Sequence, residues 1–392
     1  MNDKISEQLI FLDNNATTRV APEVIEAMLP FMSELYANPS SGHSFGRRLG
    51  PFVEHSREQV AGLIGAQSTD EIVFTSGGTE SDNWAINATL QLQPEKRHIV
   101  TTRVEHEAVR HVCERYEKSG YEVSWIDVNR DCELNLDQLE AAVRPDTALV
   151  SVMMANNETG VLFPIEEVGR IVKEKSNAIF HVDGVQAVGK VPIDLKKSEV
   201  DLFALSGHKL HAPKGIGVLY IRSGLTLAPM IIGAMHEKGR RAGTTPVPSI
   251  VGLGTACELA QQPGIHDAIQ HMRDRFEDAV LGSIGCAQLN GTKYRSKRLP
   301  NTSYISFANI EGESILAHLD EKGIYVSTGS ACNSGTHTAS PTLRAMNVPY
   351  AVAMGSIRFS FGRYNQESDV DYTLSHLTGI IDNLVAMSPF NS

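Results

Sequence analysis

The sequence predicts an α/β protein made of a large part with a mostly parallel, helix-covered sheet and a smaller α+β part. Between residues 70 and 225, short apolar runs repeatedly end in glycine or polar turns and lead into helical patterns. The runs are almost continuously apolar, as strands buried on both faces are. Beyond residue 260, helical stretches alternate with short strands instead. These observations together predict the fold class.

Five segments of the larger part show the repetition of strand, loop and helix. They are EIVFTSGGTESDNWAINATL (71–90), RHIVTTRVEHEAVRHVCERY (97–116), TALVSVMMANNETG (147–160), AIFHVDGVQAVG (178–189) and VDLFALSGHK (200–209). Such repetition forms a parallel sheet, and ligands bind beyond the carboxyl ends of its strands. A polar cluster stands at each of these ends. We therefore expect the polar clusters to border one crevice.

The stretch LAQQPGI (259–265) interrupts this repetition. A proline and a glycine end the helical pattern there, and strands such as TSYISF (302–307) follow. We therefore predict a large domain over 17–260, and a small domain made of 1–16 and 261–392.

The composition argues against several classes of protein. The chain has 392 residues with 35 basic and 46 acidic side chains, a net charge of −11, and no basic run, which disfavours nucleic-acid binding. Its five cysteines are far apart and form no CxxC pair, which argues against a zinc site and for a reduced, cytoplasmic protein. The N-terminus does not read as a signal peptide, and no segment approaches the roughly 20 apolar residues of a membrane helix.

Two charged residues at predicted strand ends suggest carbonyl chemistry. Lys209 follows an apolar strand, and an amine in that position can form a Schiff base with a carbonyl cofactor. Asp183 also follows an apolar run and can pair with a pyridinium nitrogen, which keeps that nitrogen protonated. The alternatives are a solvated surface lysine and a helix N-cap, respectively.

Two further segments at strand ends fit the same crevice. SGGTES (76–81) precedes a helix and offers N–H groups and hydroxyls to a phosphate, although a glycine turn with a capping box at Thr79 and Asp82 has the same spacing. His106 can stack on an aromatic cofactor and move protons, or it can be an ordinary surface histidine.

Three more residues complete the set of candidates. Asn157 in NNETG can hydrogen-bond a ring hydroxyl or a substrate, or can simply serve a turn. Arg358, on an expected strand, can clamp a carboxylate or form a cross-strand ion pair. Cys332 lies in STGSACNSG among small polar residues, which suits a mobile thiol better than a packed one. The alternative is an exposed loop cysteine without a function, which would have the same surroundings. A lysine, an acid, a histidine and a phosphate loop together predict a pyridoxal 5′-phosphate site.

The motifs also resemble a known family. LDNNATT, NPSSGHSFG, SGGTESDN, EHEAV, NNETG, HVDGVQAVGKVPIDL, SGHKLHAPKGIG, RRAGTTPV, STGSACNSG and SIRFSFGR occur in the order and approximate spacing of the NifS/IscS-type cysteine desulfurases, within the class V aminotransferases. HAP in HKLHAPKG is similar to the nitrogen-fixation (NifS) branch. The resemblance runs nearly end to end and implies the aspartate aminotransferase-like fold (fold type I) and a cofactor, pyridoxal 5′-phosphate.

The resemblance implies roles for residues around the cofactor ring. Lys209 matches the Schiff-base lysine, and Asp183 matches the acid that faces the pyridine nitrogen. Gln186 matches the group facing the ring hydroxyl, and His106 matches the imidazole stacked on the ring.

Other matches concern phosphate, substrate and sulfur. The phosphate ligands it implies are Gly78, Thr79, Ser206 and His208. Thr244 matches a phosphate ligand donated by a neighbouring subunit, which implies a homodimer. Asn157 matches an amide that contacts substrate and cofactor, Arg358 the arginine that grips the substrate carboxylate, and Cys332 the cysteine that accepts sulfur.

The implied reaction converts L-cysteine to L-alanine and leaves a persulfide on Cys332, which supplies sulfur for iron–sulfur cluster assembly or another acceptor. Lys209 is the expected base at Cα, with His106 assisting. Selenocysteine lysis and transamination to glyoxylate or pyruvate are alternatives on the same scaffold, but transamination needs no thiol. A non-catalytic scaffold or regulator predicts damage to Lys209 or Asp183, yet both residues are present.

Overall fold

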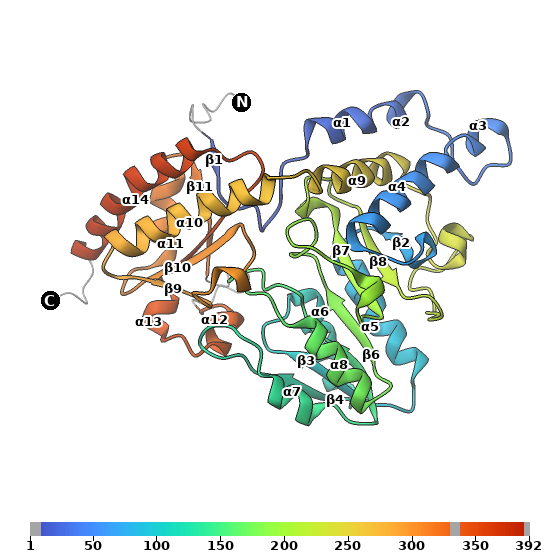
Figure 1. Ribbon diagram of the computed structural model, residues 1–392, viewed down its shortest axis with the longest axis horizontal. Coiled ribbons are helices and arrows are strands. Elements are labelled where there is room, and N and C mark those ends of the chain that lie inside the picture. The colour runs from blue at the N-terminus through green and yellow to red at the C-terminus, as the bar shows by residue number, and fades with distance from the viewer. Residues whose placement is uncertain (1–8, 330–337, 388–392) are drawn as a thin grey trace.

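The computed structural model describes residues 9–329 and 338–387 (Figure 1). Its largest sheet has seven strands in the order β2-β8-β7-β6-β5-β3-β4. These strands are β2 (Ile72–Thr75), β3 (His98–Thr102), β4 (Glu122–Ile126), β5 (Thr147–Ser151), β6 (Ile179–Asp183), β7 (Leu202–Ser206) and β8 (Gly217–Ile221). All neighbouring pairs are parallel except those made by β8. The predicted mostly parallel α/β sheet is confirmed.

Helices cover both faces of this sheet. They are α1 (Pro22–Met28), α2 (Pro30–Ser33), α3 (Ser44–Arg47), α4 (Gly50–Ile64), α5 (Gly78–Leu92), α6 (Glu107–Lys118), α7 (Leu136–Ala142), α8 (Ile165–Lys175) and α9 (Val247–Ala260). Side chains alternate between the faces along each strand. Val73 shares an apolar cluster with Trp84 of α5, whereas Phe74 belongs to the cluster of α4, α8 and α9. Helix α5 therefore lies on the opposite face from α4, α8 and α9.

The expected alternation with helices fails at two strands. After β6 the chain makes turns, and after β7 it forms only the 3₁₀ helix η3 (Gly207–Lys209) before it returns as β8. Strand β8 is antiparallel to β7, so a short connection suffices and no crossover helix is needed. The loops after β6 and β7 are thus left free to line a site.

The C-terminal half is built around a four-stranded antiparallel sheet, in the order β12-β13-β10-β9. Its strands are β9 (Ala287–Leu289), β10 (Thr302–Phe307), β12 (Ser327–Thr328) and β13 (Ser356–Ser360). The helices here are α10 (Ile265–Ser283), α11 (Gly312–Asp320), α12 (Pro341–Ala345), α13 (Tyr350–Ala353) and α14 (Glu367–Met387). One apolar cluster joins β10 and β13 to α10, α11 and α14.

The N-terminal strand lies beside this C-terminal half. Strand β1 (Ile10–Phe11) pairs in parallel with β11 (Ile324–Tyr325), and Asp13 forms an isolated bridge with Ser360. The segment after β1 then crosses to the larger sheet, as Figure 1 shows. Within the described ranges, no helix combines the length and apolarity needed to cross a membrane.

Candidate active site

A cavity of about 550 Å³ lies where β5, β6 and β7 end and where α5 and α6 begin. The predicted residues that line it are Gly78, Thr79, His106, Asn157, Asp183, Gln186, Ser206, His208 and Lys209. They come from separate loops at one edge of the sheet, as the strand order requires. The structure therefore brings most of the candidate residues into one site.

Lys209 projects into the cavity from the 3₁₀ helix after β7. Its Nζ donates hydrogen bonds to the backbone oxygens of Asn15, at 2.6 Å, and of Ala16, at 2.8 Å. Burial, with a smaller contribution from the positive charge of Arg358, lowers the pKa of Lys209 to about 8. A solvated surface lysine has neither these partners nor this pKa, so that alternative is wrong.

Asp183 is the last residue of β6 and is buried. Its Oδ1 accepts a hydrogen bond from the backbone N–H of Val185 at 2.9 Å. Burial raises the pKa of Asp183, and positive charge on His106 and Lys209 opposes this rise. The carboxylate caps a turn rather than a helix, and a cationic ring nitrogen in the cavity would stabilise its charged form.

The start of α5 forms one end of the cavity. Gly77 is the N-cap residue, and no side chain caps this helix, so the capping-box alternative for Thr79 and Asp82 is wrong. A Cβ on Gly78 would come within 2.8 Å of Cγ2 of Val185 and within 3.5 Å of Cβ of Ser206. The glycine keeps the N–H groups of the first helical turn accessible, which suits a phosphate.

His106 and His208 line the cavity with different hydrogen bonds. His106 is the N-cap of α6, and its Nδ1 accepts from the N–H of Ala108 at 3.1 Å, which fixes the ring at the cavity edge. Nδ1 of His208 lies 3.1 Å from Oγ1 of Thr17. Burial, with a smaller contribution from the charge of Lys209, lowers the pKa of His208 to about 4, so its ring is neutral at pH 7.

Gln186 is held by two groups that sequence reasoning missed. Its Nε2 donates to the backbone oxygen of Asn15 at 3.0 Å, and its Oε1 accepts from Nζ of Lys190 at 2.9 Å. Burial, followed by the charges of Lys209 and Arg358, lowers the pKa of Lys190 to about 7. The carbonyl of Asn15 thus serves both Gln186 and Lys209.

Arg358 lies on β13, as expected, next to the cavity. Its Nη1 donates to the backbone oxygen of Asn157 at 3.0 Å, and its Nη2 donates to Oδ1 of Asp13 at 2.7 Å. The ion-pair alternative is therefore present in this structure. The side chain of Asn15 donates to the same carbonyl of Asn157 at 3.1 Å, which ties this arginine to the N-terminal segment.

Cys332 lies outside the described residues. Gly329, just before that segment, and Ser340, shortly after it, are joined by a 2.9 Å hydrogen bond from the N–H of Ser340 to the backbone oxygen of Gly329. Ser327, in the strand just before, is paired with Arg358. Thr244 is exposed and is not part of the lining of the cavity.

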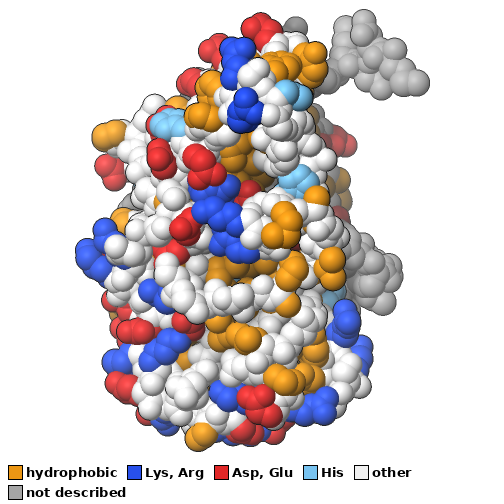
Figure 2. Space-filling model, turned by 90° about the vertical axis from the view of Figure 1, so that its right-hand side faces the viewer, with side chains coloured by type: hydrophobic (Ala, Val, Ile, Leu, Met, Phe, Trp, Pro, Cys, Tyr) orange, Lys and Arg blue, Asp and Glu red, His pale blue; other side chains and the backbone are white. Residues whose placement is uncertain are grey.

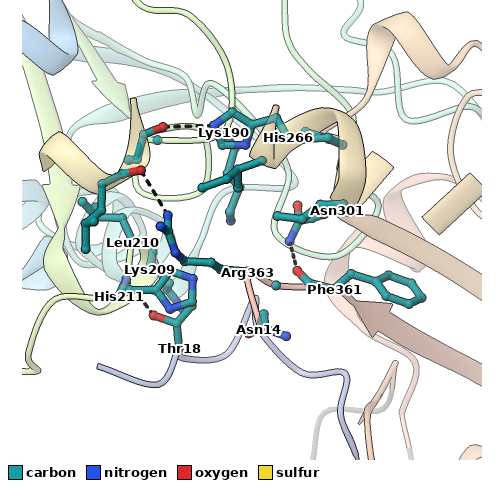
Figure 3. Close-up of a pocket in the computed structure, with 17 residues that line it drawn as sticks. Asn14, Thr18, Lys190, Lys209, Leu210, His211, His266, Asn301, Phe361 and Arg363 are labelled. Atoms are coloured by element: carbon teal, nitrogen blue, oxygen red, sulfur yellow. Dashed lines mark hydrogen bonds between the residues drawn. The ribbon is translucent and has the colours of Figure 1, made fainter. Parts of the chain in front are cut away.

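A second cavity, of about 50 Å³, lies behind Lys209 at the junction with the C-terminal half (Figure 3). Lys190, His266, Asn301 and Arg363 surround it in Figure 3, and Nε2 of His266 lies 3.2 Å from the oxygen of Ala260. Its volume is far too small for a cofactor. The larger cavity is therefore the candidate active site.

The larger cavity fits pyridoxal 5′-phosphate. It offers a lysine of lowered pKa, a buried carboxylate, an imidazole at its edge and a helix N-terminus that the absent Cβ of Gly78 leaves open. The lysine suits the carbonyl of the cofactor, and the carboxylate suits its pyridine nitrogen. The imidazole suits the aromatic face, and the helix N-terminus suits the phosphate. Among the described residues, no group of histidine, cysteine and acidic side chains suits a metal ion.

Comparisons with known proteins agree with this geometry. The family model described as "Aminotransferase class-V" matches residues 10–373. The chain is 53% identical over 387 residues to "Cysteine desulfurase" of Trichormus azollae, which covers 98% of this chain and 96% of that protein. It is 46% identical over 383 residues to "Cysteine desulfurase NifS" of Azotobacter vinelandii, covering 97% and 94%.

A solved structure described as "NIFS-LIKE PROTEIN" superposes on this chain with a TM-score of 0.90 at 39% identity. The match covers 96% of this chain and all of that one. This likeness confirms the predicted fold type. The chain belongs to the class-V aminotransferase family, in which its full-length relatives are cysteine desulfurases.

Proposed function

We propose that this protein is a pyridoxal 5′-phosphate-dependent cysteine desulfurase that converts L-cysteine to L-alanine. The single observation that carries the proposal is Lys209, whose amine has a pKa of about 8 and shares one cavity with the buried Asp183 and the open N-terminus of α5. The relatives named above support the choice of substrate, because they match almost every residue of the chain.

Each residue has a task in this reaction. When bound, the cofactor supplies a sink for the electrons released at Cα of the amino acid. Lys209 would hold the cofactor, and its free amine would take the proton from Cα, because the lowered pKa leaves much of the amine neutral near pH 8. Asp183 would keep negative charge beside the ring nitrogen, and His106 would stack on the ring and assist proton transfer.

The phosphate and the substrate are held by the remaining side chains. Gly78, Thr79, Ser206 and His208, which line the cavity, would bind the phosphate at the start of α5, and Gln186 would face the ring hydroxyl. Asn157 contacts both substrate and cofactor. The guanidinium of Arg358 would exchange its hydrogen bond to the carboxylate of Asp13 for hydrogen bonds to the carboxylate of the substrate.

Cys332 accepts the sulfur. Its thiolate attacks the sulfur of the substrate, a sulfur–sulfur bond forms, and the Cβ–S bond breaks with its electron pair going to the carbon. Protonation of that carbon, and return of a proton to Cα in place of the one that Lys209 took, gives alanine, and the persulfide passes to an acceptor such as an iron–sulfur cluster scaffold. The pairing of Ser327 with Arg358 supports this role, because it anchors the strand before the segment with Cys332 beside the carboxylate site.

We also propose a cytoplasmic homodimer in which Thr244 contacts the neighbouring subunit's phosphate. Ile232 and Met235, in the segment before Thr244, are 85% and 81% exposed. Neighbouring apolar side chains exposed in this way are typical of a surface that binds another protein. Patches of apolar side chains appear between charged ones on the face in Figure 2. The division into 17–260 and the two flanking segments is proposed too, and the pairing of β1 with β11 supports it.

The test is the visible absorption spectrum of the purified protein before and after L-cysteine, with alanine and sulfide measured under reductant. We expect a yellow protein whose band shifts, and equal amounts of alanine and sulfide. If the protein is yellow and does not react with L-cysteine, but catalyses transamination to glyoxylate or pyruvate, the proposed substrate is wrong and the proposed cofactor stands. A colourless protein that the cofactor cannot reconstitute overturns the whole proposal.

A further inference from the structure

A second group of buried titratable residues lies near Asp183. Asp82 of α5 is 1% exposed and is one of the residues that line the cavity. His181 stands two residues before Asp183 on β6, on the same face of the strand, and is fully buried. Glu105, in the loop between β3 and α6, is also buried. No part of the proposed reaction uses these three side chains.

Hydrogen bonds leave specific atoms of this group without partners. Oε1 of Glu105 accepts from Oγ1 of Thr102 at 2.7 Å and from the N–H of Met153 at 3.0 Å. Nδ1 of His181 lies 2.9 Å from Oγ of Ser151. Within the described part of the chain, Oδ1 of Asp82, Nε2 of His181 and Oε2 of Glu105 have no hydrogen-bond partner. The first two of these atoms face each other at 3.4 Å.

The charges around the group do not balance if every carboxyl is ionised. Oδ1 of Asp82 lies 3.4 Å from Nε2 of His181 on β6, and Asp183 and Glu105 are close enough for their charges to act on Asp82. The charge of Glu105 also acts on the thiol of Cys113 in α6. The positive groups nearby, His106 and Lys209, act on Asp183 from the cavity side. Three buried carboxylates around a neutral imidazole would therefore repel one another without compensation.

We propose that Asp82 and Glu105 are protonated in the native protein, and that the Asp82 carboxyl donates its proton to Nε2 of His181. This hydrogen bond satisfies both unpartnered atoms of the facing pair, Oδ1 of Asp82 and Nε2 of His181, and Nδ1–H of His181 then donates to Oγ of Ser151. Asp183 is left as the one carboxylate of this group, so its charge is directed at the ring nitrogen in the cavity. The inference deepens the proposed function and rests on it.

The titration behaviour of the group agrees with this arrangement. Burial, followed by the negative charges of Asp183 and Glu105, raises the pKa of Asp82 well above its usual range. Burial raises the pKa of Glu105 to about 8. Burial lowers the pKa of His181 to about 3, so the ring is a neutral acceptor at pH 7 rather than a cation that would pair with an ionised Asp82.

The test is infrared spectroscopy of the purified holoenzyme in heavy water at pH 7, which detects the carbonyl stretch of protonated carboxyl groups. We expect this band in the wild-type protein, a weaker band in each of Asp82→Asn and Glu105→Gln, and no change in Asp137→Asn, which alters an exposed acid of α7. A wild-type protein without the band overturns the proposal, as does equal intensity in wild type and both variants. The carbonyl band does not depend on activity. Its absence would therefore contradict this proposal alone, whereas loss of activity would contradict the proposed function.

A second measurement follows the visible spectrum of the bound cofactor as a function of pH. Asp82→Asn replaces one neutral group by another, so we expect the apparent pKa of the cofactor to move by less than about 0.3 unit. Removal of a neighbouring ionised carboxylate would shift that pKa by roughly 1 to 3 units. A shift of that size shows that Asp82 is ionised and overturns the proposal.

Discussion

At the scale of single residues, Lys209 governs how the site takes up its cofactor. Its amine is nucleophilic only without the extra proton, and its pKa is about 8. We therefore expect the rate at which cofactor-free protein regains the visible band to fall about tenfold for each pH unit below 8, and to level off above it. Stopped-flow absorbance over pH 6 to 9 measures this rate. A rate that keeps rising to pH 10 would mean that the lysine titrates as if exposed.

Cys332 allows a prediction with a matched control in the same chain. Cys332→Ser should lower alanine formation from L-cysteine at least roughly 100-fold while the visible spectrum stays, since the thiolate is the nucleophile and a hydroxyl does not replace it. Cys286→Ser changes a half-buried cysteine beside α14 and should leave the activity within about twofold. Full activity of Cys332→Ser would assign the sulfur transfer to another group.

Arg358 offers a test of carboxylate binding. Arg358→Lys keeps the charge but loses the planar fork that can hold a carboxylate with two hydrogen bonds. We expect KM for L-cysteine to rise roughly 10- to 100-fold with a smaller change in kcat, because charged hydrogen bonds contribute about 1.5 to 3 kcal/mol each. Steady-state kinetics measures both constants. A loss confined to kcat would place Arg358 in the chemistry rather than in binding.

At the scale of elements, the first turn of α5 depends on glycine. Gly78→Ala puts a Cβ within 2.8 Å of Val185 and narrows the phosphate end of the cavity, so we expect cofactor affinity to fall about tenfold or more. Equilibrium titration of cofactor-free protein measures this affinity. The control is Gly62→Ala in the helix α4, where nothing lies within 4 Å of the new Cβ. That change should leave affinity intact and raise the free energy of unfolding by about 0.5 to 1 kcal/mol.

The strands and helices also show where sequence periodicity has limits. The runs that became β2, β3, β5, β6 and β7 were predictable because each is short, apolar and followed by a polar turn. The antiparallel direction of β8 was not predictable in this way, because a buried strand has the same pattern in either direction. The helix expected after β7 is missing because the chain turns straight back as β8. The helix expected after β6 is missing because the crossover to the parallel strand β7 consists of turns and the short 3₁₀ helix η2 (Leu195–Lys197).

At the scale of the whole molecule, the exposed apolar side chains near Thr244 predict the oligomeric state. The double variant Ile232→Asp with Met235→Asp should sediment as a monomer at micromolar concentration, because burying two carboxylates in an interface is costly. It should also bind the cofactor more weakly, since the partner's phosphate ligand is lost. Tyr294→Asp, at an exposed position of the C-terminal half, should leave the dimer intact. A double variant that remains dimeric would locate the interface elsewhere.

The sequence by itself determined the fold class, the cofactor and the order of motifs along the chain. Lys209, Asp183, His106 and SGGTES each follow a recognisable strand, and the ends of parallel strands meet at one edge whatever the details of packing. The local sequence was sufficient to predict these site residues, because each strand and the polar cluster that follows it lie within a few positions of each other.

Only the tertiary structure decided which groups support these residues. The carbonyl of Asn15 accepts from Lys209 across 194 positions of sequence, and a backbone oxygen leaves no mark in the residue type. Lys190 reads as a surface lysine until burial lowers its pKa, and Asp82 reads as a helix-start acid until α5 packs it against His181. Burial and contacts between distant segments set proton affinities, and both arise only when the chain has folded.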